Sequence, residues 1–348
     1  MTDKILYGRK MKLSIILMPN REYAAEQDYY GYPSSSNIQA PESINIELNG
    51  VEDTSLSVEF EVNYPGMTGW YYSEIVVYNF NERDLKRVID EGAAVKLEAG
   101  YVNGNYGMIF EGYIFQCLFE RENIVDYKLT LRCVDGRRLF TENFTSFSLP
   151  SGMNNQLAHF NAIHAYAKEE IKIAKGKTTS MLKTENHPRG TTVFSTPQKA
   201  LDDLLRHYSI SEPSNTSITT EKGETVTFDM NDPPDPNVIH VSPDGTGGLI
   251  GSPVQTQYGC NFCVLLNANI KLTAPRKQVQ IDNSLIRAMK AQQNVELLPP
   301  FDDDMIYQVI GVKHVGETRG NSWYTYVTGI NQGGAQALYL TYAAKMGR

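Results

Sequence analysis

The sequence has few cysteines, no long apolar run and no surplus of basic residues. Four cysteines in 348 residues are too sparse for a disulfide scaffold, which favours assembly in the cytosol with reduced thiols. No stretch approaches the roughly 20 apolar residues of a membrane helix, and the first residues lead into a strand-like run rather than a signal peptide. A formal net charge of −8 argues against generic binding of nucleic acid through its phosphates.

Tyrosine, in contrast, is abundant, with 21 residues against 2 Trp and 13 Phe. Tyrosine favours β-strands, where it is often half-buried, and it also suits extensive protein contacts. A composition of 41% hydrophobic and 21% charged residues is that of a globular chain long enough for two or three domains.

The most informative pattern is a weak internal repeat. Its matched segments are Met108–Glu111 with Met305–Gln308, Val95–Glu98 with Val279–Asp282, and Asn79-Phe80 with Asn261-Phe262. Without a gap, the first match places Glu120 opposite Glu317 and Tyr127 opposite Tyr324. Two copies of one β domain let three chains form a ring with apparent six-fold symmetry, which points to a structural adaptor rather than an enzyme.

Hydrophobic periodicity predicts a mainly β (α+β) protein. Strands are expected over 10–18, 43–48, 56–62, 75–78, 93–101, 108–119, 127–134, 305–314 and 323–330. A helix is expected from Asn79 to Gly92 with Asn81 as its N-cap, and further helices over 153–174, from Thr196 onward and over 283–294. The domains would be a β unit at 1–137, an inserted α+β domain at 138–252 and a second β unit at 253–348.

No motif for chemistry reaches a convincing pattern. Cys260 and Cys263 form a CxxC without two further zinc ligands, and Gly176-Lys177-Thr178 lacks the earlier glycine of a phosphate-binding loop. The histidines form no metal motif, Ser195 lacks a nucleophile context, and Asp302-Asp303-Asp304 is typical of a solvated turn. The histidines are His159, His164, His187, His207, His240 and His314. We therefore predict no catalytic, cofactor-binding or metal-binding residue.

The chain resembles the baseplate hub proteins of contractile-tailed bacteriophages, of the Mu type and the late-control-D type. The segments that carry the resemblance are 60–62, 74–80, 95–101, 107–114, 131–136, 251–253, 265–271, 307–314 and 316–324. The most distinctive of them is Gly316-Glu317-Thr318-Arg319-Gly320-Asn321.

This resemblance implies two tail-tube-like β-barrel or sandwich domains and a homotrimer without enzymatic activity. The trimeric ring would join the six-fold tail tube to a trimeric central spike, which would be a separate chain. Its channel would accommodate the end of the tape measure protein and later the passing DNA. The partners would thus be the tail tube protein, the spike, the tape measure protein and neighbouring baseplate proteins. The location would be the virion tail, after assembly in the host cytoplasm.

Two alternatives remain at this point. Another tube-like component, such as a distal tail or tube-initiator protein, would carry one copy of the domain and form a hexamer. A phage cell-wall hydrolase would need a cleft with two carboxylates, and no spacing in the sequence indicates one.

Overall fold

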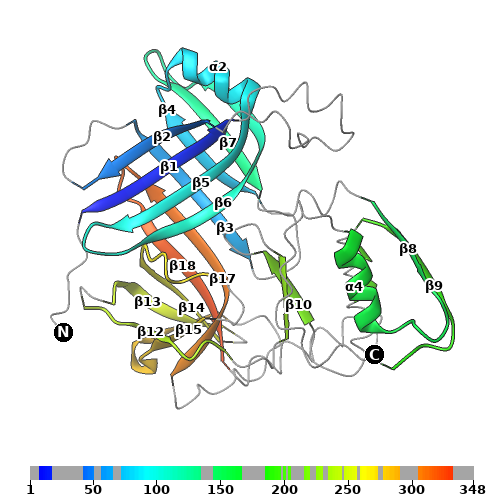
Figure 1. Cartoon of the computed structure of the whole chain (residues 1–348). Coiled ribbons are helices and arrows are strands. Elements are labelled where there is room, and N and C mark those ends of the chain that lie inside the picture. The colour runs from blue at the N-terminus through cyan, green and yellow to red at the C-terminus, as the bar shows by residue number, and fades with distance from the viewer. Residues whose placement is uncertain are drawn as a thin grey trace.

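The structure is a computed structural model. It describes residues 8–17, 42–50, 56–65, 72–134, 144–166, 185–196, 199–200, 203–204, 215–219, 225–229, 234–244, 247–256, 259–272, 277–290 and 305–331. Two β units and a smaller helical unit make up this part of the chain (Figure 1). The prediction of a mainly β protein is confirmed.

The first unit is an antiparallel sheet. Its strands are β1 (Arg9–Leu17), β2 (Glu42–Asn49), β3 (Val58–Pro65), β4 (Ser73–Tyr78), β5 (Gly92–Tyr101), β6 (Gly104–Arg121) and β7 (Tyr127–Val134), in the order β3-β4-β7-β6-β5-β1-β2. Alternate side chains point to one buried face, as Leu13 and Ile15 of β1 show, because successive residues of a strand face opposite sides. The expected strands are therefore present, with their apolar sides in the core.

Helix α2 (Glu82–Glu91) packs near one end of this unit. Asn81 accepts a hydrogen bond from the Arg83 backbone N–H through its side chain, so the predicted N-cap is confirmed. Leu85 and Val88 are buried, whereas Ile89, on the same predicted apolar stripe, remains 51% exposed.

The second unit repeats this arrangement. Its elements are β12 (Val238–Val241), β13 (Leu249–Thr256), β14 (Gly259–Leu265), β15 (Gln278–Ile281), η1 (Asn283–Leu285), β16 (Ala288–Lys290), β17 (Ile306–Glu317) and β18 (Trp323–Ile330). The order is β13-β14-β18-β17, with β15 on β17, β12 parallel on β15, and β16 parallel on β13.

The helix predicted over 283–294 is wrong in its described part, 283–290. Asp282 caps a single 3-10 turn, accepting from the Ser284 N–H, and the chain then extends as β16. Parallel pairing of β16 with Val254–Thr256 satisfies the backbone that a helix would otherwise satisfy locally.

The small unit lies beside the sheets and contains β8 (Thr145–Leu149), α4 (Gln156–Tyr166) and β9 (Thr191–Ser195) (Figure 1). Phe160 and Ile163 of α4 are buried, as the predicted stripe required. Thr196 accepts from the Lys199 N–H, which confirms the predicted cap. A separate hairpin pairs β10 (Asn215–Thr219) with β11 (Thr225–Asp229).

The domain boundaries at 137/138 and 252/253 stay predictions. Strand pairing bears on the second one, because β12 and β13 both belong to the second sheet. We propose that the second β unit includes β12 and therefore begins no later than Val238. Within the described ranges, the helices are too short or too polar to span a lipid bilayer.

A candidate assembly interface

The hairpins of the two β units have the same residue-by-residue strand pairing. In the first hairpin, β6–β7, Phe119 pairs with Leu129; in the second hairpin, β17–β18, His314 pairs with Thr325. Counting along both hairpins from these pairs, all partners correspond, including one bulged residue in each long strand: Phe115 in β6 and Ile310 in β17. The repeat that the sequence indicated is therefore present in the strand pairing.

The neighbouring strands extend the correspondence. Val95 of β5 pairs with Gly112, and Val279 of β15 pairs with Tyr307, the residue that occupies the position of Gly112 in the second hairpin. Strand β4 pairs with β7 as β14 pairs with β18. Strand β3 in turn pairs with β4 as β13 pairs with β14. The match of Val95 with Val279 is thus confirmed residue for residue.

Other parts of the ungapped alignment were wrong. The register aligns Phe110, not Met108, with Met305, and Tyr127 with Trp323 rather than with Tyr324. The two turns also differ by one residue, because four residues separate the pair Glu317 and Ser322 but three separate Glu122 and Asp126, so no ungapped alignment can match both strands of the hairpins. Asn79 follows β4, whereas Asn261 lies within β14, so these two are not equivalent.

Within the chain, the two units join edge to edge through a contact that we call the junction. Residues Gly311–Glu317 of β17 pair antiparallel with Glu59–Pro65 of β3, which makes the two sheets one continuous 14-stranded sheet (Figure 1). At its end, the Thr318 N–H donates to the Val58 carbonyl, and the Val58 N–H donates to the Thr318 hydroxyl, both at 2.9 Å.

An aromatic and a cationic side chain seal the junction. Trp323 is 1% exposed, donates through Nε1 to the Gly100 carbonyl at 3.1 Å, and meets Phe60 edge-on with ring centroids 5.4 Å apart. The Arg9 guanidinium lies 5.5 Å from the Trp323 ring centroid. It also donates to the carbonyls of Glu317, Gly320 and Asn321 in the turn of the second hairpin. Gly100 and Phe60 thus belong to the first unit and Trp323 to the second.

Gly316 is required by this packing. It pairs with Phe60, and a Cβ built on it would lie 2.2 Å from the Phe60 ring. Since Gly316 begins the most distinctive segment of the sequence resemblance, that segment lies at the junction.

The first hairpin has no neighbouring strand, among the described residues, in the position that β3 takes beside β17. Over Leu118–Arg121, β7 is the strand that pairs with β6, and no further described strand lies on the other side. Phe119 is 46% exposed and Tyr127 41% exposed, although their equivalents His314 and Trp323 are each 1% exposed. The two aromatic rings stack on each other at 5.6 Å. The same hairpin edge is therefore buried in one unit and exposed in the other.

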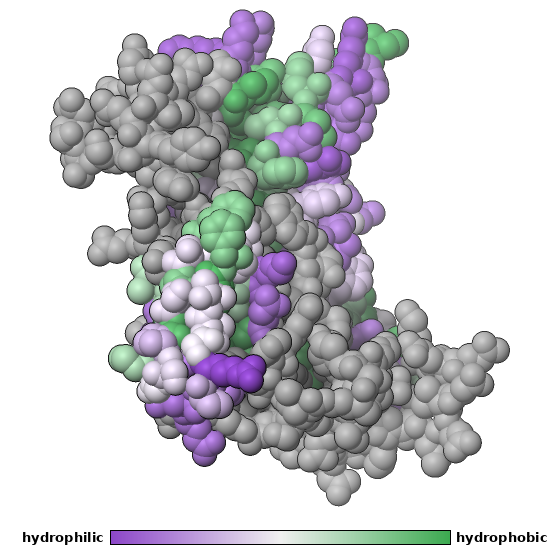
Figure 2. Space-filling view, turned by 90° about the vertical axis from the view of Figure 1, so that its right-hand side faces the viewer, coloured by the Kyte–Doolittle hydropathy of each residue, from purple (hydrophilic) through white to green (hydrophobic). Residues whose placement is uncertain are grey.

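The tip of the first hairpin is both apolar and well ordered by hydrogen bonds. Ile124 and Val125 are highly exposed, while the Asn123 side chain accepts from the N–H groups of Val125 and Asp126, each at 2.8 Å. Hydrogen bonds from Asn79 and then Asn123 lower the pKa of Asp126. Figure 2 shows apolar residues gathered among hydrophilic ones at this end of the molecule. A fixed, exposed apolar tip is suited to docking on another surface.

The face of the sheet that points away from the buried core is polar and carries cross-strand ion pairs. These are Lys12 with Glu47, Lys96 with Glu111, Lys313 with Glu61, Arg132 with Glu74, and Lys128 with Glu120. The pKa of Glu61 is lowered, first by the hydrogen bond from Asn63 and then by that from Lys313. Each exposed pair contributes little to stability, but together they offset the positive charges of this face.

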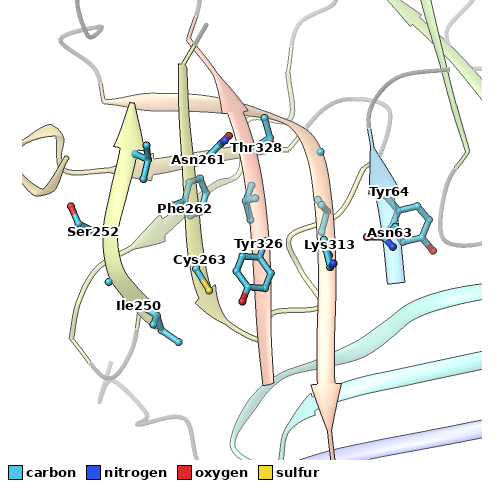
Figure 3. Close-up of a pocket in the computed structure, with 15 residues that line it drawn as sticks. Asn63, Tyr64, Ile250, Ser252, Asn261, Phe262, Cys263, Lys313, Tyr326 and Thr328 are labelled. Atoms are coloured by element: carbon cyan, nitrogen blue, oxygen red, sulfur yellow. The ribbon is translucent and has the colours of Figure 1, made fainter. Parts of the chain in front are cut away.

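A hollow of about 690 Å³ lies on the second unit and the adjoining β3. Figure 3 shows Cys263, Tyr326 and Lys313 on adjacent strands of it. The described residues that line the hollow include no carboxylate, so it holds no pair for acid–base hydrolysis.

The two cysteines of the CxxC lie on opposite faces of one strand. Cys260 is buried and Cys263 lies on the other face of β14, and burial raises their pKa values to about 12 and about 11. Burial also raises the pKa of Cys133. No three His, Cys, Asp or Glu side chains of the described chain group as metal ligands.

The remaining candidates are distributed over the molecule. His314 is buried with Nδ1 2.9 Å from the Thr325 hydroxyl, and burial lowers its pKa to about 3. His159 lies within hydrogen-bond distance of the Asn154 side chain, and Ser195 donates to the Thr196 carbonyl. His187 and His240 are exposed. His207, Gly176–Thr178 and Asp302–Asp304 lie outside the described residues, as does the side chain of His164.

Solved structures that are similar to this one include phage tail proteins. No family model and no curated protein matches the chain. Among solved structures, the 43 kDa tail protein of prophage MuSo2 from Shewanella oneidensis is 7% identical at a TM-score of 0.46, over 83% of this chain and 95% of its own. A tail protein from Neisseria meningitidis is 10% identical at 0.45, over 94% and 98%.

A third similar structure is the c3393 protein, a type VI secretion system component of E. coli. It is 9% identical at a TM-score of 0.43, over 79% of this chain and 73% of its own.

Proposed function

We propose that this chain is the structural hub of a phage-type tail baseplate. Three copies form a ring of six β units that joins a six-fold tail tube to a trimeric central spike. The role is mechanical and requires no turnover, cofactor or metal. The ring encloses the end of the tape measure protein and later the passing DNA.

The observation that carries this proposal is the edge-to-edge junction between two units in one register. Because the second hairpin already holds the first unit of the same chain, the first hairpin is left to hold the second unit of the next chain. A contact repeated head to tail in this way generates a ring if its rotation closes. Two units per chain then need three chains to match six subunits of a tube.

The polar face agrees with a passage for DNA. In a channel lined by this face, pairing each Lys or Arg with an acidic neighbour reduces its attraction for phosphate groups. The presence of two copies favours the hub over a tube-initiator or distal tail protein, which would carry one.

The test is the mass of the native particle in solution, measured by light scattering with and without a co-expressed spike candidate. We expect a mass three times the 39.1 kDa of the chain, alone or in the presence of the spike. A mass of six chains would favour the single-copy tail component, and a chain that stays monomeric under both conditions would contradict the hub.

A further inference from the structure

We propose that the hollow on the second unit binds an uncharged, extended segment of the polypeptide that the ring encloses, with one such site in each chain. The inference rests on the proposed function, because the hollow lies on the polar face that lines the channel of the proposed ring. Lys313, which forms one of the cross-strand ion pairs of that face, is also one of the residues that line the hollow.

The floor of the hollow includes a row of short side chains. Asn261 of β14 pairs with Thr328 of β18, and Thr328 pairs in turn with Gly311 of β17. Figure 3 shows Asn261 and Thr328 side by side on their adjacent strands. Because Gly311 has no side chain and its two neighbours are small, this row leaves the surface of the sheet low.

The equivalent row of the first unit is filled. Counted along the two hairpins, the equivalents of these three residues, in the same order, are Glu74, Arg132 and Gln116. The Arg132 guanidinium donates to the side-chain oxygen of Gln116 at 3.1 Å, and its Nε lies 3.5 Å from a carboxylate oxygen of Glu74. Arg132 Cζ also lies 5.3 Å from the ring centroid of Tyr72. The first unit thus fills with its own bonded side chains the place where the second unit has the hollow.

The charges around the hollow favour an uncharged occupant. The described residues that line it include no carboxylate, so a cation there would have no partner of the kind that Glu74 provides for Arg132. Lys313, the one cation among those residues, is paired with Glu61 at 2.6 Å, and an anion would have to compete with that carboxylate. Burying a charge without a partner is costly, which disfavours charged side chains and DNA phosphates alike.

Size and lining favour a segment of polypeptide. A volume of about 690 Å³ is that of a typical ligand site. Ile250 and Val254 of β13 provide aliphatic surface, and Tyr326, which is 46% exposed, provides an aromatic ring. Apolar walls with a few polar groups suit apolar side chains and neutral amides, which an extended polypeptide carries and DNA does not.

Peptide binding tests the inference. The probe is a short peptide of alternating leucine and glutamine, acetylated, amidated and labelled with a neutral fluorophore, and its anisotropy is followed as the full chain is added. We expect this neutral probe to bind about tenfold more tightly, or better, than the same peptide with lysine or glutamate in place of glutamine. It should exceed a labelled single-stranded oligonucleotide by a similar factor.

A double variant that copies the first unit should close the site. Asn261→Glu with Thr328→Arg rebuilds the pair of Glu74 and Arg132 in the hollow and should weaken binding of the neutral probe by about tenfold or more. The matched control is Thr192→Glu with Ser148→Arg, which builds the same pair on exposed, cross-strand positions of β9 and β8. This control should leave the affinity unchanged.

A measurement on the native chain covers a variant that fails to fold. Cys263 lines the hollow, and Cys117 of the first unit is partly buried to a similar degree. The neutral probe, at saturation, should slow alkylation of Cys263 by iodoacetamide and leave the alkylation of Cys117 unchanged. Mass spectrometry of the digested chain measures the two rates separately.

The outcomes separate the site from the ring. A neutral probe that binds no better than the charged peptides or the oligonucleotide overturns the inference, as does full affinity in the folded Asn261→Glu, Thr328→Arg variant or an unprotected Cys263. Any of these results in a particle of three chains leaves the hub standing. Selective binding of the neutral probe by a chain that never assembles would support the hollow as a peptide site and contradict the hub.

Discussion

The two hairpins have the same strand pairing and the same bulge but opposite surroundings. Trp323 and His314 of the second hairpin are buried at the junction, whereas Tyr127 and Phe119 of the first remain partly exposed. A buried His or Trp needs a fixed hydrogen-bond partner, which the folded chain supplies as Thr325 and Gly100. Phe119 and Tyr127 have no such buried position, and their stacked rings remain in contact with water.

The largest expected difference between the hairpins is in stability. Trp323→Ala removes a buried indole and should lower the free energy of unfolding by about 3–5 kcal/mol. Tyr127→Ala, at the equivalent exposed position, should cost about 1 kcal/mol or less in the isolated chain. Urea unfolding of dilute, unassembled protein measures both, and equal losses would contradict the assignment of one edge as buried and the other as exposed.

The second-largest expected difference between the hairpins is in their tolerance of a larger side chain. Gly316→Val places side-chain atoms inside the Phe60 ring position and should cost about 1–3 kcal/mol. Arg121→Val at the equivalent site of the first hairpin should change stability by about 0.5 kcal/mol. The comparison uses the same unfolding measurement, and a tolerated Gly316→Val would mean that β17 and β3 are not held at this distance.

The second hairpin should also be the more sensitive to acid. His314 has its pKa lowered from 6.5 to about 3 in the folded chain, so the unfolded chain binds the proton first. Stability is therefore present above the unfolded pKa of about 6.5 and falls by up to about 1.4 kcal/mol per pH unit between there and about pH 3. His314→Phe, which copies the residue at position 119, should flatten this slope in unfolding measured from pH 7 to pH 5. An unchanged slope would place the titration elsewhere.

The smallest expected effect lies on the polar face. A double-mutant cycle of Lys313→Ala and Glu61→Ala should give a coupling of about 0.2–1 kcal/mol, weakened by salt. The pair Lys128 and Glu120 on the first hairpin should couple less, because its N–O distance is 3.8 Å rather than 2.6 Å. A larger coupling at Lys128 would reverse the ranking of the two pairs.

Much of the local structure could be predicted from residues alone. Alternation placed Leu129, Leu131 and Cys133 on one face of β7, and all three are fully buried. The cap at Asn81 follows from a short-range hydrogen bond that the sequence contains in full. Residues 283–290 were mispredicted because Ala288–Lys290 pair with β13, a strand outside the range of any local sequence pattern.

The interface was less predictable. Sequence similarity pointed to two related hairpins, but the ungapped alignment was displaced by two residues in β6 and by one in β7, and the two turns differ by one residue in length. No pattern in β17 or β3 indicates that they pair, since they lie some 250 residues apart, and edge pairing uses backbone groups that every residue carries.

The sequence by itself determined strands β1 to β7, β17 and β18 and which side of each faces the core, because these depend on a two-residue period and on neighbours along the chain. Only the tertiary structure decided which strand edge meets which, and so which of two equivalent aromatic positions is buried. That choice depends on non-local packing between whole units, where Trp323 meets Phe60 and Gly100 while Tyr127 meets solvent.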